Sequence, residues 1–180
     1  MNTIDNLIAA AKTGERLKYV FFWSHKDPSG TVSKACFSQW YPRGGVEGDY
    51  SYLTAEHYMM AEKARLFGDQ RKFDEIIDAE NPGKAKALGR EVLSFDQAIW
   101  NKHKFDVAVR GNYIKFSQNS DLKEFLLNTG KRVLVEASPV DPIWGIGMSV
   151  DDPEVENPEK WKGQNLLGFA LMEVREMLRR

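Results

Sequence analysis

Apolar side chains recur at helical spacing over most of the chain. Near the N-terminus, the apolar residues from Ile4 to Ala11 predict a helix over residues 3–13, which Gly14 ends. Thr54 is a good N-cap for a second helix, and Gly68 supplies its stop. The same signals predict helices at residues 55–67, 70–79, 82–88, 95–117, 121–128 and 164–179.

Strand signals are few and short. Aromatic and β-branched runs predict extended segments at residues 19–23, 34–41, 50–53 and 133–136, with a glycine-rich loop between the second and third. These strands are too few and too scattered for a doubly wound sheet. The pattern therefore indicates a compact single-domain α+β fold, mainly helical with a few short strands.

Composition narrows the functional classes. The 180 residues suffice for one domain with its own core. With 25 basic and 26 acidic residues the net charge is −1, which provides no global attraction to nucleic acid or anionic membranes. Residues 1–18 lack the apolar core of a signal peptide, and no apolar run approaches the length of about 20 residues that spans a bilayer. We therefore expect a cytoplasmic protein without membrane contact.

Metal and redox chemistry find little support in the sequence. The single cysteine, Cys36, excludes an internal disulfide and a Cys-rich zinc site. The histidines, His25, His57 and His103, form no pair at helical ligand spacing. Phosphate-binding loops of the Walker and Rossmann types are also missing. Carboxylates are thus the strongest chemical candidates, with no metal and no cofactor expected.

One unusual stretch runs from Asp141 to Met148. It combines a carboxylate at Asp141, an indole at Trp144 and glycines at positions 145 and 147. Gly145 and Gly147 permit positive φ or a close approach of the backbone to a ligand, while Trp144 offers a flat face. This composition suits the wall of a sugar or base pocket. A loop that merely closes over the core is the alternative.

A second candidate lies on the helix that Thr54 caps. Glu56 falls in its first turn, where the helix dipole favours a carboxylate, and Lys63 follows seven residues later on the same face. An ordinary charged surface stripe is the alternative, and His57 is expected to be structural. Glu56 and Asp141 can divide glycosidic bond cleavage between acid/base work and stabilisation of a ribosyl cation. Trp100 and Trp144 would then stack on the base or line the sugar.

With these residues in place, the chain resembles the YbiA/NADAR family over roughly residues 19–178. The residues before position 19 lie outside the resemblance, so we expect an N-terminal helical extension at 1–18 and the family domain at 19–180. Among the stretches that carry the resemblance are Thr54-Ala-Glu-His57, Trp100-Asn101, Asp141-Pro-Ile-Trp-Gly-Ile-Gly147 and Gly163-Gln-Asn-Leu-Leu-Gly168.

The resemblance implies an N-glycosidase that cuts the bond between ribose C1 and nitrogen. It places the family's catalytic glutamate at Glu56 and its pocket tryptophan and aspartate at Trp100 and Asp141. Trp144 matches the tryptophan of the Trp-Gly motif, and Lys63 and Asn165 match polar positions expected near the ligand. One departure concerns Gln39, which stands where many relatives have asparagine in Ser-Asn-Phe.

Several substrates remain open at this point. The leading hypothesis is removal of ADP-ribose from modified guanine, with transient contact to nucleic acid. Hydrolysis of early riboflavin-pathway intermediates is the second, and a module that binds ADP-ribose without cleaving it is the third. An interaction protein whose tryptophans are all core is a further alternative. The sequence makes no prediction of oligomeric state.

Overall fold

The computed structural model describes residues 3–26 and 30–180. The chain forms two compact units, which are described separately. Unit 1 comprises residues 1–38 and 121–180, and unit 2 comprises residues 39–120. In chain order, the elements of unit 1 are α1 (Ile4–Lys12), β1 (Tyr19–Phe22), the 3₁₀ helix η1 (Lys34–Phe37), α6 (Ser120–Leu127), β4 (Val133–Glu136), η2 (Pro158–Lys160) and α7 (Leu166–Met177). Those of unit 2 are β2 (Gly45–Glu47), β3 (Tyr50–Tyr52), α2 (Ala55–Leu66), α3 (Gln70–Ile77), α4 (Pro82–Arg90) and α5 (Gln97–Gln118).

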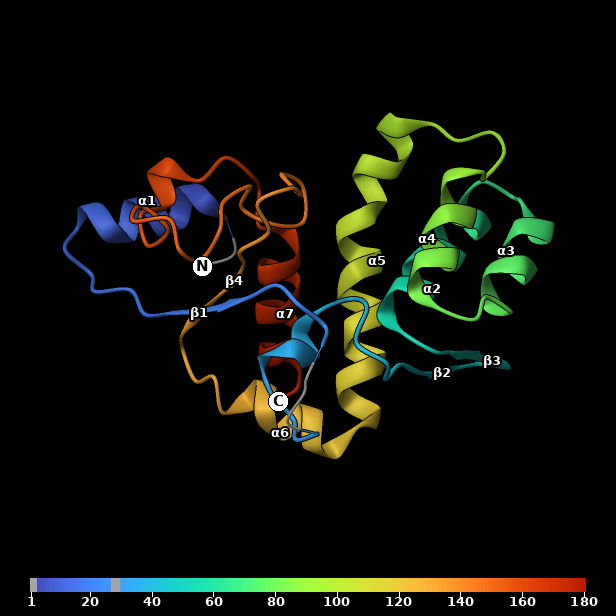
Figure 1. Cartoon of the computed structure of the whole chain (residues 1–180), viewed down its shortest axis with the longest axis horizontal. Helices are drawn as coiled ribbons and strands as arrows, with labels where there is room; N and C mark the ends of the chain where they lie inside the picture. Colours follow the sequence, from blue (N-terminus) through green and yellow to red (C-terminus); the bar gives the residue numbers. More distant parts are fainter. Residues whose placement is uncertain (1–2, 27–29) are drawn as a thin grey trace. The chain divides into compact units, whose positions relative to one another are not determined.

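Unit 1 is built on a two-stranded parallel sheet. β1 and β4 pair in register from Tyr19 opposite Val133 to Phe22 opposite Glu136. Helix α7 packs against β4 (Figure 1). Gly168 permits this approach, because a Cβ atom there would collide with the carbonyl oxygen of Leu134. Both strands thus carry their carboxyl ends to the same edge, where the loop containing Asp141 begins.

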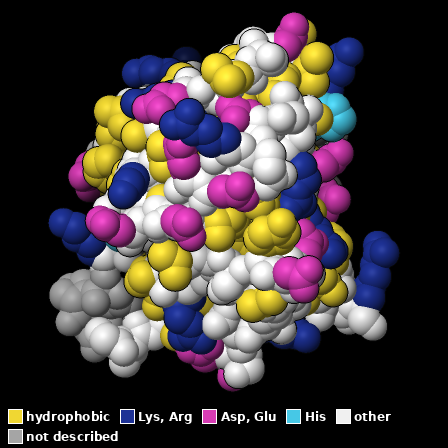
Figure 2. Space-filling view, turned by 90° about the vertical axis from the view of Figure 1, so that its right-hand side faces the viewer, with side chains coloured by type: hydrophobic (Ala, Val, Ile, Leu, Met, Phe, Trp, Pro, Cys, Tyr) yellow, Lys and Arg dark blue, Asp and Glu magenta, His cyan; other side chains and the backbone are white. Residues whose placement is uncertain are grey.

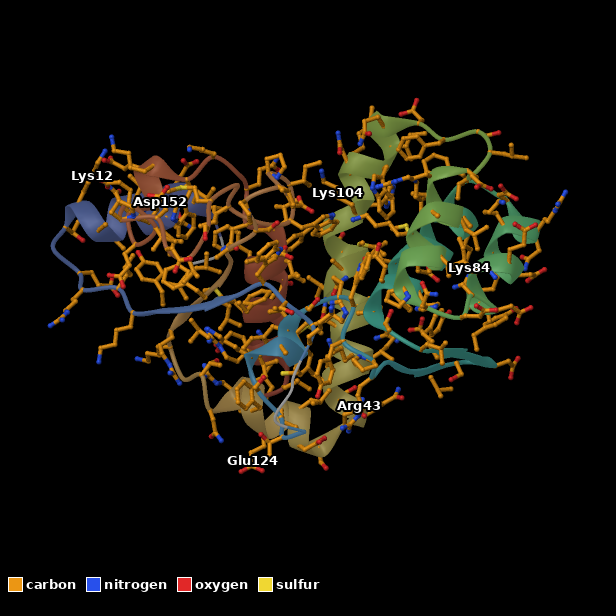
Figure 3. All side chains as sticks on the ribbon, in the orientation of Figure 1. Lys12, Arg43, Lys84, Lys104, Glu124 and Asp152 are labelled. Carbon is orange, nitrogen blue, oxygen red and sulfur yellow. The ribbon has the colours of Figure 1, made fainter. Side chains whose placement is uncertain are left out.

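Unit 2 is organised around α2, which packs against α3, α4 and α5. Seven consecutive residues of α2, from Ala55 to Ala61, are buried, as expected for a helix surrounded on several sides. The antiparallel hairpin β2–β3 precedes α2. Arg43, labelled in Figure 3, donates to Asn119 Oδ1 through Nε at 3.0 Å and Nη2 at 2.9 Å, which ties the segment before β2 to the end of α5.

The predicted helices and the α+β class are confirmed, with shifts of a few residues at element ends. The strand expected at residues 34–41 is wrong. Residues 34–37 form η1, whose N-cap Ser33 accepts a hydrogen bond from Ala35 N, and three consecutive residues are buried where a strand would alternate. The expected glycine-rich loop in turn contains the short strand β2.

The N-terminal helix α1 belongs to unit 1. It packs on η2, and Lys12 pairs with Glu159 at 2.8 Å. The boundary between residues 18 and 19, and the assignment of 19–180 to one domain, stay predictions. On the face in Figure 2, acidic and basic side chains are interspersed. Within the described ranges, no helix combines the length and the apolarity that crossing a membrane requires.

Candidate active site

Glu56 is a buried carboxylate at the start of α2. Thr54 caps the helix through its hydroxyl, which accepts a hydrogen bond from His57 N. Glu56 N donates to the carbonyl oxygen of Gln39 at 3.0 Å, and the Glu56 residue is 3% exposed. A carboxylate in the first helical turn is favoured by the positive end of the helix dipole. Local capping therefore determines the position of the predicted catalytic group.

His57 is structural, as the sequence analysis expects. Its Nε2 donates to the carbonyl oxygen of Ala79 at 3.0 Å, so in the neutral ring Nδ1 accepts from the hydroxyl of Thr54 at 2.8 Å. Burial lowers the pKa of His57, although the bond to Ala79 opposes that shift. The neutral ring joins the start of α2 to the end of α3.

The side chain of Gln39 is held by a residue that sequence reasoning missed. Asn112, in the middle of α5 and fully buried, donates through Nδ2 to Gln39 Oε1 at 2.8 Å and to the carbonyl oxygen of Ala108 at 2.9 Å. Gln39 Nε2 lies 4.0 Å from the sulfur of Met59 on α2. A polar residue within the buried stripe of a long helix is the signal that would have pointed to Asn112.

Lys63 lies beside two aromatic side chains, Phe95 and Trp100, in a corner of unit 2. Its ammonium donates to the carbonyl oxygen of Gly89 at 2.7 Å and lies 4.0 Å from the ring centre of Phe95 and 6.0 Å from that of Trp100. Burial lowers the pKa of Lys63, and the positive charge of Arg90 lowers it further. Sequence reasoning missed Phe95, which is 39% exposed. The corner combines cations with aromatic faces.

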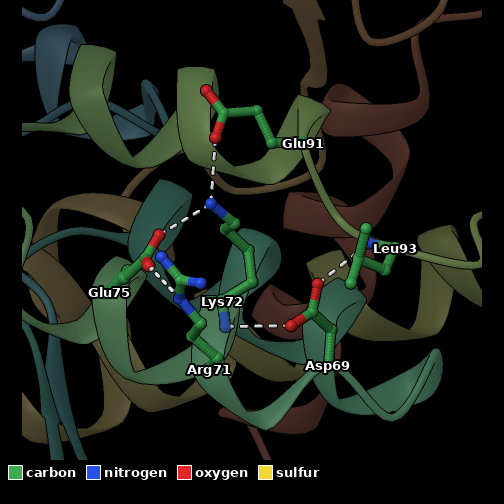
Figure 4. A network of polar contacts seen from close by, with 6 residues as sticks. All are labelled: Asp69, Arg71, Lys72, Glu75, Glu91 and Leu93. Carbon is green, nitrogen blue, oxygen red and sulfur yellow. Dashed lines mark hydrogen bonds and ion pairs between the residues drawn. The ribbon is translucent and has the colours of Figure 1, made fainter.

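A polar network fastens the segment that carries Phe95 (Figure 4). Asp69 accepts from Lys72 N at 3.0 Å, which caps α3, and from Leu93 N at 2.9 Å. The Lys72 ammonium also reaches Glu91 Oε2 at 2.9 Å. The backbone two residues before Phe95 is therefore tied to α3, which limits the positions that the ring can adopt.

Asp141 organises the loop after β4 in unit 1. Its Oδ1 accepts from the backbone N–H groups of Ile143 at 2.9 Å and Trp144 at 2.8 Å. The carbonyl oxygens of the same two residues accept from Leu166 N and Leu167 N at the start of α7. The first N–H groups of α7 are thus satisfied by this loop, and Trp144 is held at a helix N-terminus while remaining half-buried.

The two glycines of this loop do different work. Gly147 adopts a φ of +64°, a conformation that other residues rarely take. Gly145 instead permits a close approach, because a Cβ atom there would lie 2.8 Å from the carbonyl oxygen of Glu136. The expected positive φ is therefore found at Gly147. The close approach at Gly145 is to the protein's own backbone, and an approach of either glycine to a ligand stays a prediction.

Asn165 joins the loop to the free edge of β4. Its Oδ1 accepts from Glu136 N at 3.0 Å, and its Nδ2 donates to the carbonyl oxygen of Leu134 at 3.0 Å. The amide thus takes the place of a peptide group in a neighbouring parallel strand. The residue is fully buried and left-handed, with φ 52°. These contacts describe a positioning residue, and ligand contact by Asn165 stays a prediction.

The predicted residues fall into two groups. Unit 2 contains Gln39, Glu56, Lys63 and Trp100, and unit 1 contains Asp141, Trp144, Gly145, Gly147 and Asn165. Their catalytic and substrate-binding roles stay predictions. Across residues 3–26 and 30–180, no three His, Cys, Asp or Glu side chains gather as a metal site would require.

Comparison with known proteins identifies the family. The NADAR domain model matches residues 21–179. The mimivirus protein named N-glycosidase R617, from Acanthamoeba polyphaga mimivirus, is 48% identical over 165 residues, covering 88% of this chain and 95% of that protein. N-glycosidase YbiA of Escherichia coli K12 is 32% identical over 157 residues, covering 87% of this chain and 86% of its own length.

The solved structure of E. coli YbiA extends the likeness to three dimensions. It matches with a TM-score of 0.72 at 28% identity, over 90% of this chain and 85% of that one. The span of the NADAR domain model, residues 21–179, includes every predicted site residue. The chain is therefore an enzyme of the NADAR domain family, a hydrolase of the N-glycosidase class.

Proposed function

We propose that this N-glycosidase removes ADP-ribose from modified guanine in nucleic acid. The bond between ribose C1 and the guanine nitrogen breaks, the hydroxyl of a water molecule adds to C1, and the nitrogen receives a proton. Only water is consumed, so the reaction requires no cofactor. The observation that carries this choice of substrate is the corner of unit 2 in which Lys63, near Arg90, meets Phe95 and Trp100.

This corner suits a nucleotide that carries a diphosphate. Cationic side chains attract phosphate oxygens, and aromatic faces stack on a base. Trp100 is 8% exposed and Phe95 is 39% exposed, so one ring supports the corner from within while the other presents a face to solvent. ADP-ribose offers both a diphosphate and an adenine to such a surface.

Glu56 is the proposed acid/base. A carboxylate can protonate the departing nitrogen and activate water, the two proton transfers that N-glycoside hydrolysis needs. Asp141 has the second proposed role, stabilisation of the positive charge that develops on the ribosyl ring. Gln39 and Trp144 are proposed to contact the substrate, with Gln39 oriented by Asn112.

A side-by-side hydrolysis assay tests the proposal. The purified protein is incubated with DNA containing ADP-ribosylated guanine and, separately, with the two early riboflavin intermediates. Glu56→Gln preserves shape and removes the acid, and Glu80→Gln, an exposed acid of the same unit, is the matched control. We expect release of ADP-ribose by the wild-type and Glu80→Gln proteins and its loss in Glu56→Gln, with substrate binding retained.

Other outcomes would replace the proposal. Release of ribose 5-phosphate from the riboflavin intermediates alone would assign the protein to metabolism. Tight binding of ADP-ribosylated DNA without release by the wild-type protein would assign it to recognition rather than cleavage. Near-normal turnover by Glu56→Gln would refute the role of that carboxylate.

A further inference from the structure

Unit 1 contains a groove that none of the predicted site residues line. Its volume is about 650 Å³. It lies where β1 and β4 begin, whereas the Asp141 loop follows the end of β4. The four residues of β4 separate these two edges by about 13 Å. The lining residues come from the segment before β1 and from the turn between α6 and β4: Glu15, Arg16, Leu17, Lys18, Asn128, Thr129, Gly130, Lys131, Arg132 and Val133.

The groove is strongly basic. Arg16, Lys18, Lys131 and Arg132 line it together with a single carboxylate, Glu15. All four cationic residues are exposed. In the described part of the chain, none of the four takes part in an ion pair, whereas other surface cations such as Lys12 do. Four positive charges against one carboxylate around one hollow create a local field that attracts anions, despite the near-neutral chain.

Two arginines, the exposed Arg132 and the buried Arg175, hold the turn that presents two of these cations. Arg132 donates from Nε to the carbonyl oxygen of Thr129 at 2.8 Å and from Nη2 to that of Asn128 at 2.7 Å. Arg175 of α7, 2% exposed, donates to Thr129 Oγ1 at 2.7 Å and to the carbonyl oxygen of Arg132 at 2.8 Å. The turn that carries Lys131 is therefore preorganised, which reduces the entropy lost on binding.

A purely structural role explains only part of this arrangement. Arg132 and Arg175 donate to carbonyl groups of the segment that follows α6, as cations near helix C-termini often do. Arg16, Lys18 and Lys131 have no such bonds among the described contacts. These three cations, on two separate segments, are the observation that points to an anionic ligand.

The chemistry of the groove selects the ligand. Its lining contains no aromatic side chain that could stack on a base, so it is suited to phosphate groups rather than to a nucleoside. An enzyme that acts on a base in nucleic acid also needs that base unpaired or extruded from the duplex. We infer that this groove binds the phosphodiester backbone of a single-stranded nucleic acid, without regard to sequence. The biological sense of this binding rests on the proposed function, because a nucleic-acid substrate brings its backbone with it.

Binding of unmodified DNA tests the inference without turnover. A fluorescent single-stranded 12-mer is titrated at several salt concentrations, and its anisotropy is measured. Lys18→Gln/Lys131→Gln removes two groove cations. Lys84→Gln/Lys102→Gln, on exposed lysines of unit 2, removes the same charge elsewhere (Lys84 is labelled in Figure 3). We expect the groove variant to bind about tenfold more weakly at 50 mM salt and to lower the slope of log Kd against log salt by about 1.4, at about 0.7 per phosphate contact.

The outcomes separate this inference from the proposed function. Equal effects of the two variant pairs, or no binding by the wild-type protein, would overturn the groove assignment. So would inorganic pyrophosphate binding as tightly as the 12-mer, which would indicate a site for small anions. Groove-dependent binding with no release of ADP-ribose would support the inference and refute only the proposed function. A thermal melt of the groove variant close to that of the wild-type protein verifies that it folds.

Discussion

Replacing Asn165 tests whether this residue positions β4 or contacts the ligand. Its amide makes two buried hydrogen bonds to the backbone of Glu136 and Leu134. In Asn165→Ala, one N–H and one carbonyl group lose their partners inside the protein, at about 1–3 kcal/mol each. The left-handed φ of 52° adds about 1 kcal/mol for alanine. We expect the free energy of unfolding to fall by about 4 kcal/mol.

A second variant at position 165 separates the loss of the hydrogen bonds from the backbone strain, and a variant elsewhere serves as the control. Asn165→Gly removes the same two hydrogen bonds but takes the left-handed conformation without strain. We expect it to lose about 3 kcal/mol. Asn101→Ala, on the exposed face of α5, is the control and should change the free energy of unfolding by less than about 0.5 kcal/mol.

Urea denaturation followed by tryptophan fluorescence provides the measurement, together with kcat and KM for hydrolysis under conditions where each variant is folded. A positioning role predicts a large loss of stability in both Asn165 variants. A loss below about 1 kcal/mol in Asn165→Gly, accompanied by a raised KM, would refute the positioning role and favour direct ligand contact.

Three further predictions concern the same loops and helices. Gly145→Ala should reduce the free energy of unfolding in urea by about 1–3 kcal/mol, because its Cβ would lie 2.8 Å from the carbonyl oxygen of Glu136; an unchanged midpoint would contradict this. Because burial lowers the pKa of His57 below its ordinary 6.5, the unfolded chain binds the proton first. Stability should therefore fall as pH drops below 6.5, by at most about 1.4 kcal/mol per pH unit, and His57→Gln should remove that component of the pH dependence. Asp141→Asn keeps an oxygen for the N–H groups of Ile143 and Trp144, so it should retain the melting temperature and lose turnover, while Asp141→Ala should lose both; an active Asp141→Asn would show that the charge is dispensable.

Local signals were sufficient for most of the fold. Helix α2 begins where Thr54 caps it, and β4 has the bounds expected from its β-branched residues, because caps and residue preferences act over a few positions. The segment after Ser33 is the exception, because its local signals conflict. Its composition suits a strand, but three adjacent buried side chains and a serine cap favour a 3₁₀ turn.

The candidate site shows a similar division. Glu56 and Asp141 were evident in the sequence because a helix start and a glycine-rich loop are local features. Phe95 and Asn112 were not, since each depends on a partner far along the chain: Phe95 lies against Lys63, and Asn112 bonds Gln39. No local spacing encodes such contacts.

The sequence alone determined where helices begin, which residues are chemically competent, and the resemblance to the NADAR family. Tertiary structure decided how those residues are used. The amide of Asn165 forms hydrogen bonds with the edge of β4. The ring of His57 joins α2 to the end of α3, and four cations from two distant segments line one groove. The physical reason is that hydrogen bonds and electrostatic fields act through space, between groups that only the folded chain brings within a few ångströms of each other.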